Sequence, residues 1–145
     1  MPVTKVKSVW NAGELVTKVV ATGKPVSKDS DAVKVQTLSA DTTVAAVDCG
    51  YRTYIDTDAK TITLPSTAAG LSYTFVNAGA NGTVAVTVAP AAIDKFQGCG
   101  ITAADNKAII NTKATAKLGD MIKIVADGVD GWIIQEMVGI WARQA

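Results

Sequence analysis

Residues 61–90 read T-I-T-L-P-S-T-A-A-G-L-S-Y-T-F-V-N-A-G-A-N-G-T-V-A-V-T-V-A-P, and this stretch decides the fold. Large apolar residues alternate with small or polar ones over 71–77 and again over 83–89. A period of two is typical of a half-buried strand. Asn81-Gly82, between the two runs, tolerates positive φ and favours a tight turn. The stretch therefore predicts two strands joined as a β-hairpin.

The composition also favours strands. Val, Ile and Thr together number 46 of the 145 residues, and β-branched residues favour strands over helices. A chain of this length forms one domain with a real core. We therefore expect an all-β fold, a compact antiparallel β-sandwich or small barrel of jelly-roll type with an extended N-terminal arm. The predicted boundaries are 1–31 for the arm and 32–145 for the β-domain.

Further strands flank the central stretch. Residues 121–126 and 132–137 predict a second hairpin around the turn D-G-V-D-G. A strand is expected over 32–38, with weaker candidates at 42–48 and 52–56 and a short strand at 61–64 that Pro65 ends. Residues 103–115 leave two interpretations open, a helical turn in their first half or a strand in their second half. The aromatic residues Tyr73, Phe75 and Trp132 occupy strand positions and are expected in the core.

Residues 1–31 differ from the rest of the chain. They are rich in charge and turn formers, and the β-branched residues of 14–20 disfavour a helix. An extended arm with one or two strand-like pieces fits this composition. Trp10 either folds back onto the domain or anchors a subunit interface, where Trp is enriched.

Charge and hydropathy limit the partners. The net charge of +1 gives no field that would attract nucleic acid. No apolar run reaches the roughly 18 residues of a membrane span, and the start M-P-V-T-K-V-K lacks the apolar core of a signal peptide. We therefore expect a protein made in a cytosol, with Cys49 and Cys99 reduced and packed as small apolar residues; a disulfide between them is the alternative. The charged fraction of only 19% indicates either a surface covered by another subunit or Ala-rich loops.

The titratable residues argue against catalysis. Histidine is absent, which removes Ser-His-Asp and Cys-His nucleophiles and most transition-metal sites. Glu14 and Glu136 are the only glutamates, so paired acids for glycoside hydrolysis are not expected. Asp pairs at 56/58 and 127/130 fit ordinary turn chemistry better than a Ca²⁺ site. The sequence predicts no enzyme, no cofactor and no metal.

Three segments together resemble the head decoration (cement) proteins of tailed bacteriophages. They are M-P-V-T-K-V-K-S-V-W-N-A-G-E-L-V at the start, I-T-L-P-S-T-A-A-G-L-S-Y-T-F-V-N-A-G in the middle and G-D-M-I-K-I-V-A-D-G-V-D-G-W-I-I-Q-E-M-V-G-I-W near the end. The first combines a basic alternating segment with a Trp, a turn ending in Gly and a Leu-Val pair. One departure is Thr17, which follows Leu-Val where the group often has an aromatic residue.

The resemblance implies a structural virion protein that binds the outer surface of an icosahedral capsid and bridges neighbouring capsomers. The implied partners are the major capsid protein and two further copies of the chain in a homotrimer, with no nucleic acid and no membrane. The residues expected to attach to the capsid are Lys5, Lys7, Trp10, Leu15 and Val16. Those expected at the subunit interface are Trp141 and Arg143.

A second interpretation keeps the β-domain but changes its role. A receptor- or glycan-binding knob on the virion surface would place aromatic and acidic residues at exposed loop tips. Tyr51, Tyr54 and the carboxylates of Asp127 and Asp130 are the candidates for such a site.

Overall fold

The structure is a computed structural model, and it describes residues 7–11, 14–18, 33–68 and 70–145. The chain divides into two compact units, Met1–Val33 and Lys34–Ala145. The predicted boundary between 31 and 32 lies two residues before this division. The described part of the chain contains no helix with the length and apolar character needed to cross a bilayer.

The smaller unit contains a two-stranded antiparallel sheet. Strands β1 (Lys7–Asn11) and β2 (Glu14–Lys18) pair from Lys7 opposite Lys18 to Asn11 opposite Glu14. The backbone over 14–18 is a strand, as the β-branched residues of this segment indicate.

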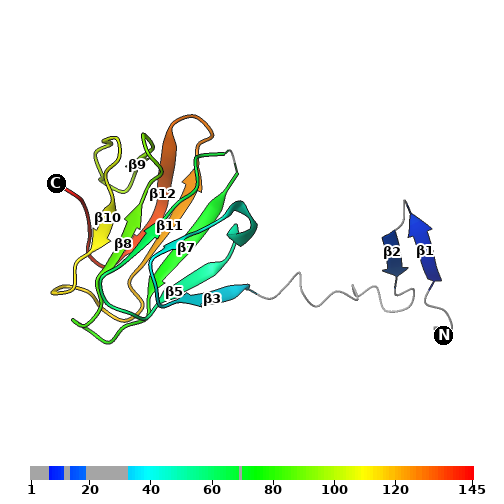
Figure 1. Cartoon of the computed structure of the whole chain (residues 1–145), viewed down its shortest axis with the longest axis horizontal. Coiled ribbons are helices and arrows are strands. Elements are labelled where there is room, and N and C mark those ends of the chain that lie inside the picture. Colours follow the sequence, from blue (N-terminus) through cyan, green and yellow to red (C-terminus); the bar gives the residue numbers. More distant parts are fainter. Residues whose placement is uncertain (1–6, 12–13, 19–32, 69) are drawn as a thin grey trace. The chain divides into compact units, whose positions relative to one another are not determined.

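The larger unit is built of two mixed sheets (Figure 1). One has six strands in the order β3-β5-β7-β11-β12-β9, and the other has five in the order β13-β10-β8-β6-β4. The elements are β3 (Val35–Leu38), β4 (Thr42–Thr43), the 3₁₀ turn η1 (Ala46–Asp48), β5 (Arg52–Ile55), β6 (Lys60–Thr63), β7 (Ser72–Asn77), β8 (Val86–Ala89), β9 (Lys95–Gln97), β10 (Ile109–Asn111), β11 (Met121–Ala126), β12 (Gly131–Val138) and β13 (Trp141–Arg143).

Consecutive strands from β3 to β8 alternate between the two sheets. Strands two apart in sequence therefore become neighbours, and β3, β5 and β7 run parallel in one sheet while β4, β6 and β8 run parallel in the other. Parallel neighbours need a crossover connection, and here a strand of the opposite sheet supplies it. Strands β9 and β12 also pair in parallel, which makes five parallel strand pairs in the larger unit. The prediction of an antiparallel domain is therefore wrong for these pairs.

The hairpin predicted over 71–89 is wrong. Strands β7 and β8 are present where the alternation indicated, but they belong to different sheets. The buried Asn77 side chain accepts a hydrogen bond from Gly79 N and donates one to Val84 O, at 2.9 Å each. These bonds hold residues 78–85 as a connection that crosses from one sheet to the other.

The hairpin predicted over 121–137 is confirmed. Strands β11 and β12 pair antiparallel, with a bulge after Lys123 that leaves Gln135 unpaired. Among the remaining predicted strands, β3 and β5 lie within the expected ranges, and β6 begins and ends one residue before the predicted strand at 61–64. Residues 42–48 give only β4 and η1, and β10 supports the strand interpretation of 108–115.

Both sheets contribute to one hydrophobic core. Tyr73, Phe75 and Trp132 of the six-stranded sheet are fully buried, as predicted, and Ile62 and Val88 of the five-stranded sheet pack into the same cluster. The ring centroids of Tyr73 and Trp132 lie 5.6 Å apart. This core fixes which side chains of each strand point inward and which remain on the surface.

Candidate interaction surfaces

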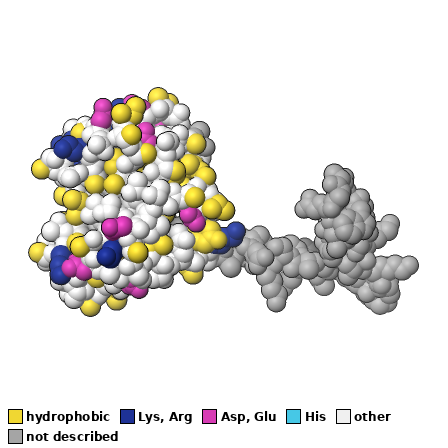
Figure 2. All heavy atoms as spheres, in the orientation of Figure 1, with side chains coloured by type: hydrophobic (Ala, Val, Ile, Leu, Met, Phe, Trp, Pro, Cys, Tyr) yellow, Lys and Arg dark blue, Asp and Glu magenta, His cyan; other side chains and the backbone are white. Residues whose placement is uncertain are grey.

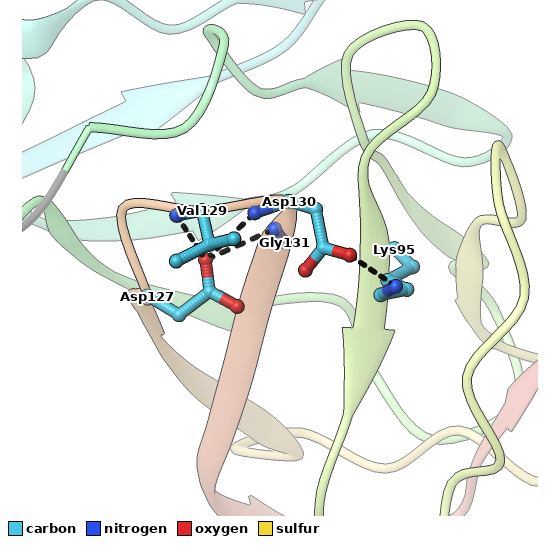
Figure 3. A network of polar contacts seen from close by, with 5 residues as sticks. All are labelled: Lys95, Asp127, Val129, Asp130 and Gly131. Carbon is cyan, nitrogen blue, oxygen red and sulfur yellow. Dashed lines mark hydrogen bonds and ion pairs between the residues drawn. The ribbon is translucent and has the colours of Figure 1, made fainter.

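The turn between β11 and β12 is held by a carboxylate (Figure 3). Asp127 Oδ1 accepts hydrogen bonds from the backbone N–H groups of Val129, Asp130 and Gly131 at 2.8 to 3.1 Å. These bonds, with the positive charge of Lys95 nearby, lower the pKa of Asp127 below its ordinary value. The turn-chemistry prediction for Asp127 is confirmed.

Lys95 joins this turn to strand β9. Its ammonium group forms an ion pair with Asp130, and this contact raises the pKa of Lys95 (Figure 3). The backbone N–H of Lys95 also donates to Asp130 O at 3.2 Å. Both the carboxylate and the backbone carbonyl of Asp130 are therefore paired with Lys95 within the chain.

The second Asp pair is also used structurally. Asp58 accepts a hydrogen bond from Ala85 N at 2.8 Å and forms an ion pair with Lys113, and both contacts lower its pKa. Asp56 accepts from the hydroxyl groups of Ser39 and Thr57, which lowers its pKa. No cluster of three metal-ligating side chains is present among the described residues.

A buried polar network joins the two sheets. Asn111 is fully buried and accepts from Asn77 Nδ2 at 2.7 Å, while its own amide donates to Asp120 Oδ2 and to Ile140 O at 2.9 Å each. Asp120 Oδ2 also accepts from Lys117 N at 2.9 Å. These groups satisfy one another, as buried polar groups require. Their arrangement is that of a structural network rather than a reactive site.

An open depression shares Lys117 and Ile140 with this network. It measures about 410 Å³ and is lined by Asn81, Gly82, Ala114, Thr115, Ala116, Lys117 and Ile140. Ile140 is 59% exposed at its rim. The lining offers one ammonium group and no carboxylate, so it presents no acid–base pair.

The outward side of the six-stranded sheet forms an extended surface, which we call the outer face. It consists of the side chains that alternate with the core positions on β3, β5, β7, β11 and β12. Cross-strand register aligns these side chains in rows. An apolar row contains Thr37, Tyr54, Val76, Met121 and Val138, and a charged row beside it contains Val35, Arg52, Thr74, Lys123 and Glu136.

The charged side chains of the charged row form no ion pair with other described residues. Within residues 33–68 and 70–145, the ion pairs are Lys95–Asp130 and Lys113–Asp58, so Arg52, Lys123 and Glu136 have none there. Arg52 and Glu136 are exposed, and Lys123 is half-buried. Apolar side chains at the margins are also open to solvent, with Val35 58% and Val138 45% exposed. On the side shown in Figure 2, the larger unit has few charged side chains.

Apolar side chains also occupy two neighbouring loop tips. Val129 is 84% exposed and Ile93 is 76% exposed. Their loops are adjacent because Gly131 pairs with Lys95. Both residues are aliphatic and offer no aromatic ring for stacking on a sugar.

The residues predicted for capsid attachment fall in the smaller unit. Lys7 and Trp10 lie on β1, and Leu15 and Val16 lie on β2, with Trp10 opposite Leu15 in the register. Lys5 lies outside the described residues. The hairpin brings four of the five positions into one small sheet.

The two residues predicted at a subunit interface have different environments. Trp141 is only 6% exposed, packs in the core, and its indole N–H donates to Val138 O at 2.9 Å. Its side chain therefore leaves little surface for a neighbouring subunit. Arg143 is exposed and donates to Thr102 O at 2.9 Å.

The remaining predicted positions are also placed by the structure. Tyr54 belongs to the outer face rather than to a loop tip, and Tyr51 is half-buried with Lys34 Nζ 5.9 Å from its ring centroid. Cys49 and Cys99 are free thiols. Cys99 is exposed, which corrects the expectation that it packs inside.

Sequence reasoning did not find the outer face. The alternating residues of 121–126 are apolar or long-chained on both sides, which is a signal that neither side is simply solvated. The rows depend on strand register, which no local pattern reveals. Comparison of the chain with protein-family models and with curated proteins gives no match.

Proposed function

We propose that this protein is a structural component of a phage virion that binds the outer surface of the icosahedral capsid and bridges neighbouring capsomers. The observation that carries the proposal is the division of the chain into a small unit with a two-stranded sheet and a larger β-built unit. The hairpin holds four of the residues that the resemblance assigns to capsid attachment. A separate attachment element on a rigid body suits a protein that spans a seam between subunits.

The larger unit supports a passive role. Its two sheets contribute side chains to one core, and this arrangement favours a sandwich over a small barrel. Asp56, Asp58, Asp127 and Asp130 accept hydrogen bonds or form ion pairs within the chain. We therefore propose a binding protein, not an enzyme, with no cofactor.

The partners follow from the same proposal. The major capsid protein is the binding partner, the virion surface is the location, and the resemblance implies a homotrimer. Weak contacts repeated on such an assembly add through effective concentration, so each attachment site needs only modest affinity. Bridging contacts would raise the internal pressure that the shell withstands.

The test is binding to purified expanded shells. Co-sedimentation should show saturable binding of the full chain, and removal of residues 1–18 should abolish it. Within the full chain, Lys7→Glu and Trp10→Ala should each weaken binding at least tenfold, whereas Lys117→Glu on the larger unit should not. Undiminished coating by the shortened protein would overturn the assignment of the hairpin.

The alternative is a receptor- or glycan-binding knob, and the exposed Val129 and Ile93 on adjacent loops favour its receptor-binding form. A glycan array and a cell-adsorption assay separate the two functions. A capsid-binding protein should give no signal in either assay. Adsorption that is lost in the double variant Ile93→Ser/Val129→Ser would favour the knob.

A further inference from the structure

We infer that the outer face of the six-stranded sheet binds the same face of a second copy of this chain, around a two-fold axis parallel to the strands. The inference goes beyond the proposed function and does not depend on it, because it concerns the free protein and uses only the larger unit. The evidence is the order of strands β5, β7, β11 and β12 in the sheet (Figure 1) and the register that aligns their side chains in rows.

The sheet order makes the face self-complementary. An axis between β7 and β11 places β5 of one copy over β12 of the other, and β7 over β11. Within the charged row, Arg52 then faces Glu136 of the second copy, and Thr74 faces Lys123. Symmetry repeats each of these pairs, as in any isologous contact.

The apolar row matches under the same rotation. Tyr54 of one copy faces Val138 of the other, and Val76 faces Met121. Val76 is only 7% exposed, so Tyr54, Met121 and Val138 supply most of the apolar contact. Sheets that pack face to face keep their strands within about 30° of each other, so the rows stay aligned near the axis. Apolar side chains therefore meet apolar side chains, Arg52 meets Glu136, and Lys123 meets the neutral Thr74.

The charges also disfavour the other face-to-face two-fold arrangement, in which the axis runs perpendicular to the strands. An axis across the strands would place each strand over its own copy. If it ran along the charged row, Arg52, Lys123 and Glu136 would each face themselves, and if it ran between the rows, these charges would face apolar side chains. Like charges held face to face disfavour association. Within one molecule Arg52 and Glu136 lie three strand spacings apart, about 14 Å, which is too far for an ion pair. Only a second copy can pair them in this way.

The size of the face sets the expected strength. Four strands about 4.8 Å apart and five residues long give a footprint of roughly 330 Å² per copy. Stable complexes cover about 800 Å² per partner. We therefore expect a dimer that dissociates on dilution rather than a permanent one.

The experiment measures the mass of the full chain over a wide concentration range by sedimentation and light scattering. The wild-type protein should change from monomer to dimer as concentration rises. Arg52→Glu and Glu136→Arg should each raise the dissociation constant at least about tenfold, because each creates two like-charge contacts. The double variant Arg52→Glu/Glu136→Arg should return to within about threefold of wild type, because it restores opposite charges.

The matched control is Lys60→Glu, a charge reversal on β6 of the five-stranded sheet, which should leave the dimer unchanged. A monomer at every concentration would overturn the inference. So would a trimer that Arg52→Glu does not affect, or an oligomer that only Lys60→Glu disrupts. Shell binding is measured separately, so failure here and failure of the capsid proposal are distinguishable.

Discussion

Tyr73 shows how burial controls a single ionisable residue. Its side chain is fully buried, and its hydroxyl donates to Ala45 O at 2.8 Å. Burial, aided by coulombic repulsion from Cys49 and Asp48, raises the pKa of Tyr73 to about 12. The unfolded chain has an ordinary tyrosine pKa of about 10, so it loses the proton first as pH rises. The stabilisation is therefore complete below pH 10 and is lost between about pH 10 and 12.

We predict that the free energy of unfolding of the wild type falls by up to about 3 kcal/mol more than that of Tyr73→Phe over this range. At pH 8 the variant should be less stable by about 1 kcal/mol, because Ala45 O loses its donor. Urea unfolding at pH 8 to 11.5 measures both effects, and Tyr54→Phe on the outer face is the control. Parallel pH profiles for wild type and Tyr73→Phe would contradict the assigned cause.

At this scale the sequence was informative about the core. The alternation around Tyr73 and Phe75 identified inward positions correctly, because burial of every second residue follows from strand geometry. Trp141 was different. The resemblance implied an interface residue at this position near the C-terminus, yet the indole lies in the core. Its position depends on the pairing of β13 with β10, which is not a local property.

The two predicted hairpins show which features of the strands could be predicted from the sequence. In 121–137 the strands are joined by a short turn that Asp127 stabilises locally, so the sequence was sufficient. In 71–89 the connection is longer, and the buried Asn77 directs it into the opposite sheet. Periodicity indicates which side chains are buried but not which sheet a strand joins. The rows of the outer face could not be predicted for the same reason.

The connection from β12 to β13 offers a direct test of the buried network. Gly139 has φ of +87°, and a Cβ there would lie 2.2 Å from Asp120 Oδ1. Asn111 and Lys117 N hold that carboxylate in place, so it cannot move without breaking hydrogen bonds. We predict that Gly139→Ala lowers the free energy of unfolding by about 3 kcal/mol or more.

Gly119→Ala is the matched control. Gly119 has φ of +91°, but a Cβ there would meet nothing within 4 Å. This variant should lose only about 1 kcal/mol, the cost of positive φ for a residue with a side chain. Chemical denaturation of both variants isolates the steric contribution of Asp120. Equal losses of stability in the two variants would show that the network accommodates the added methyl group at little energetic cost.

For the whole molecule, the division into Met1–Val33 and Lys34–Ala145 has a consequence for stability. The described hydrophobic core draws its residues from the larger unit, from Val44 to Trp141. We predict that a chain beginning at Lys34 folds alone and unfolds within about 3 °C of the full-length protein, because a change of 1 kcal/mol shifts the midpoint of such a domain by several degrees. Calorimetry of both chains tests this. A midpoint lowered by about 10 °C would mean that residues 1–33 stabilise the larger unit, and loss of shell binding on truncation would then reflect instability rather than loss of an attachment element.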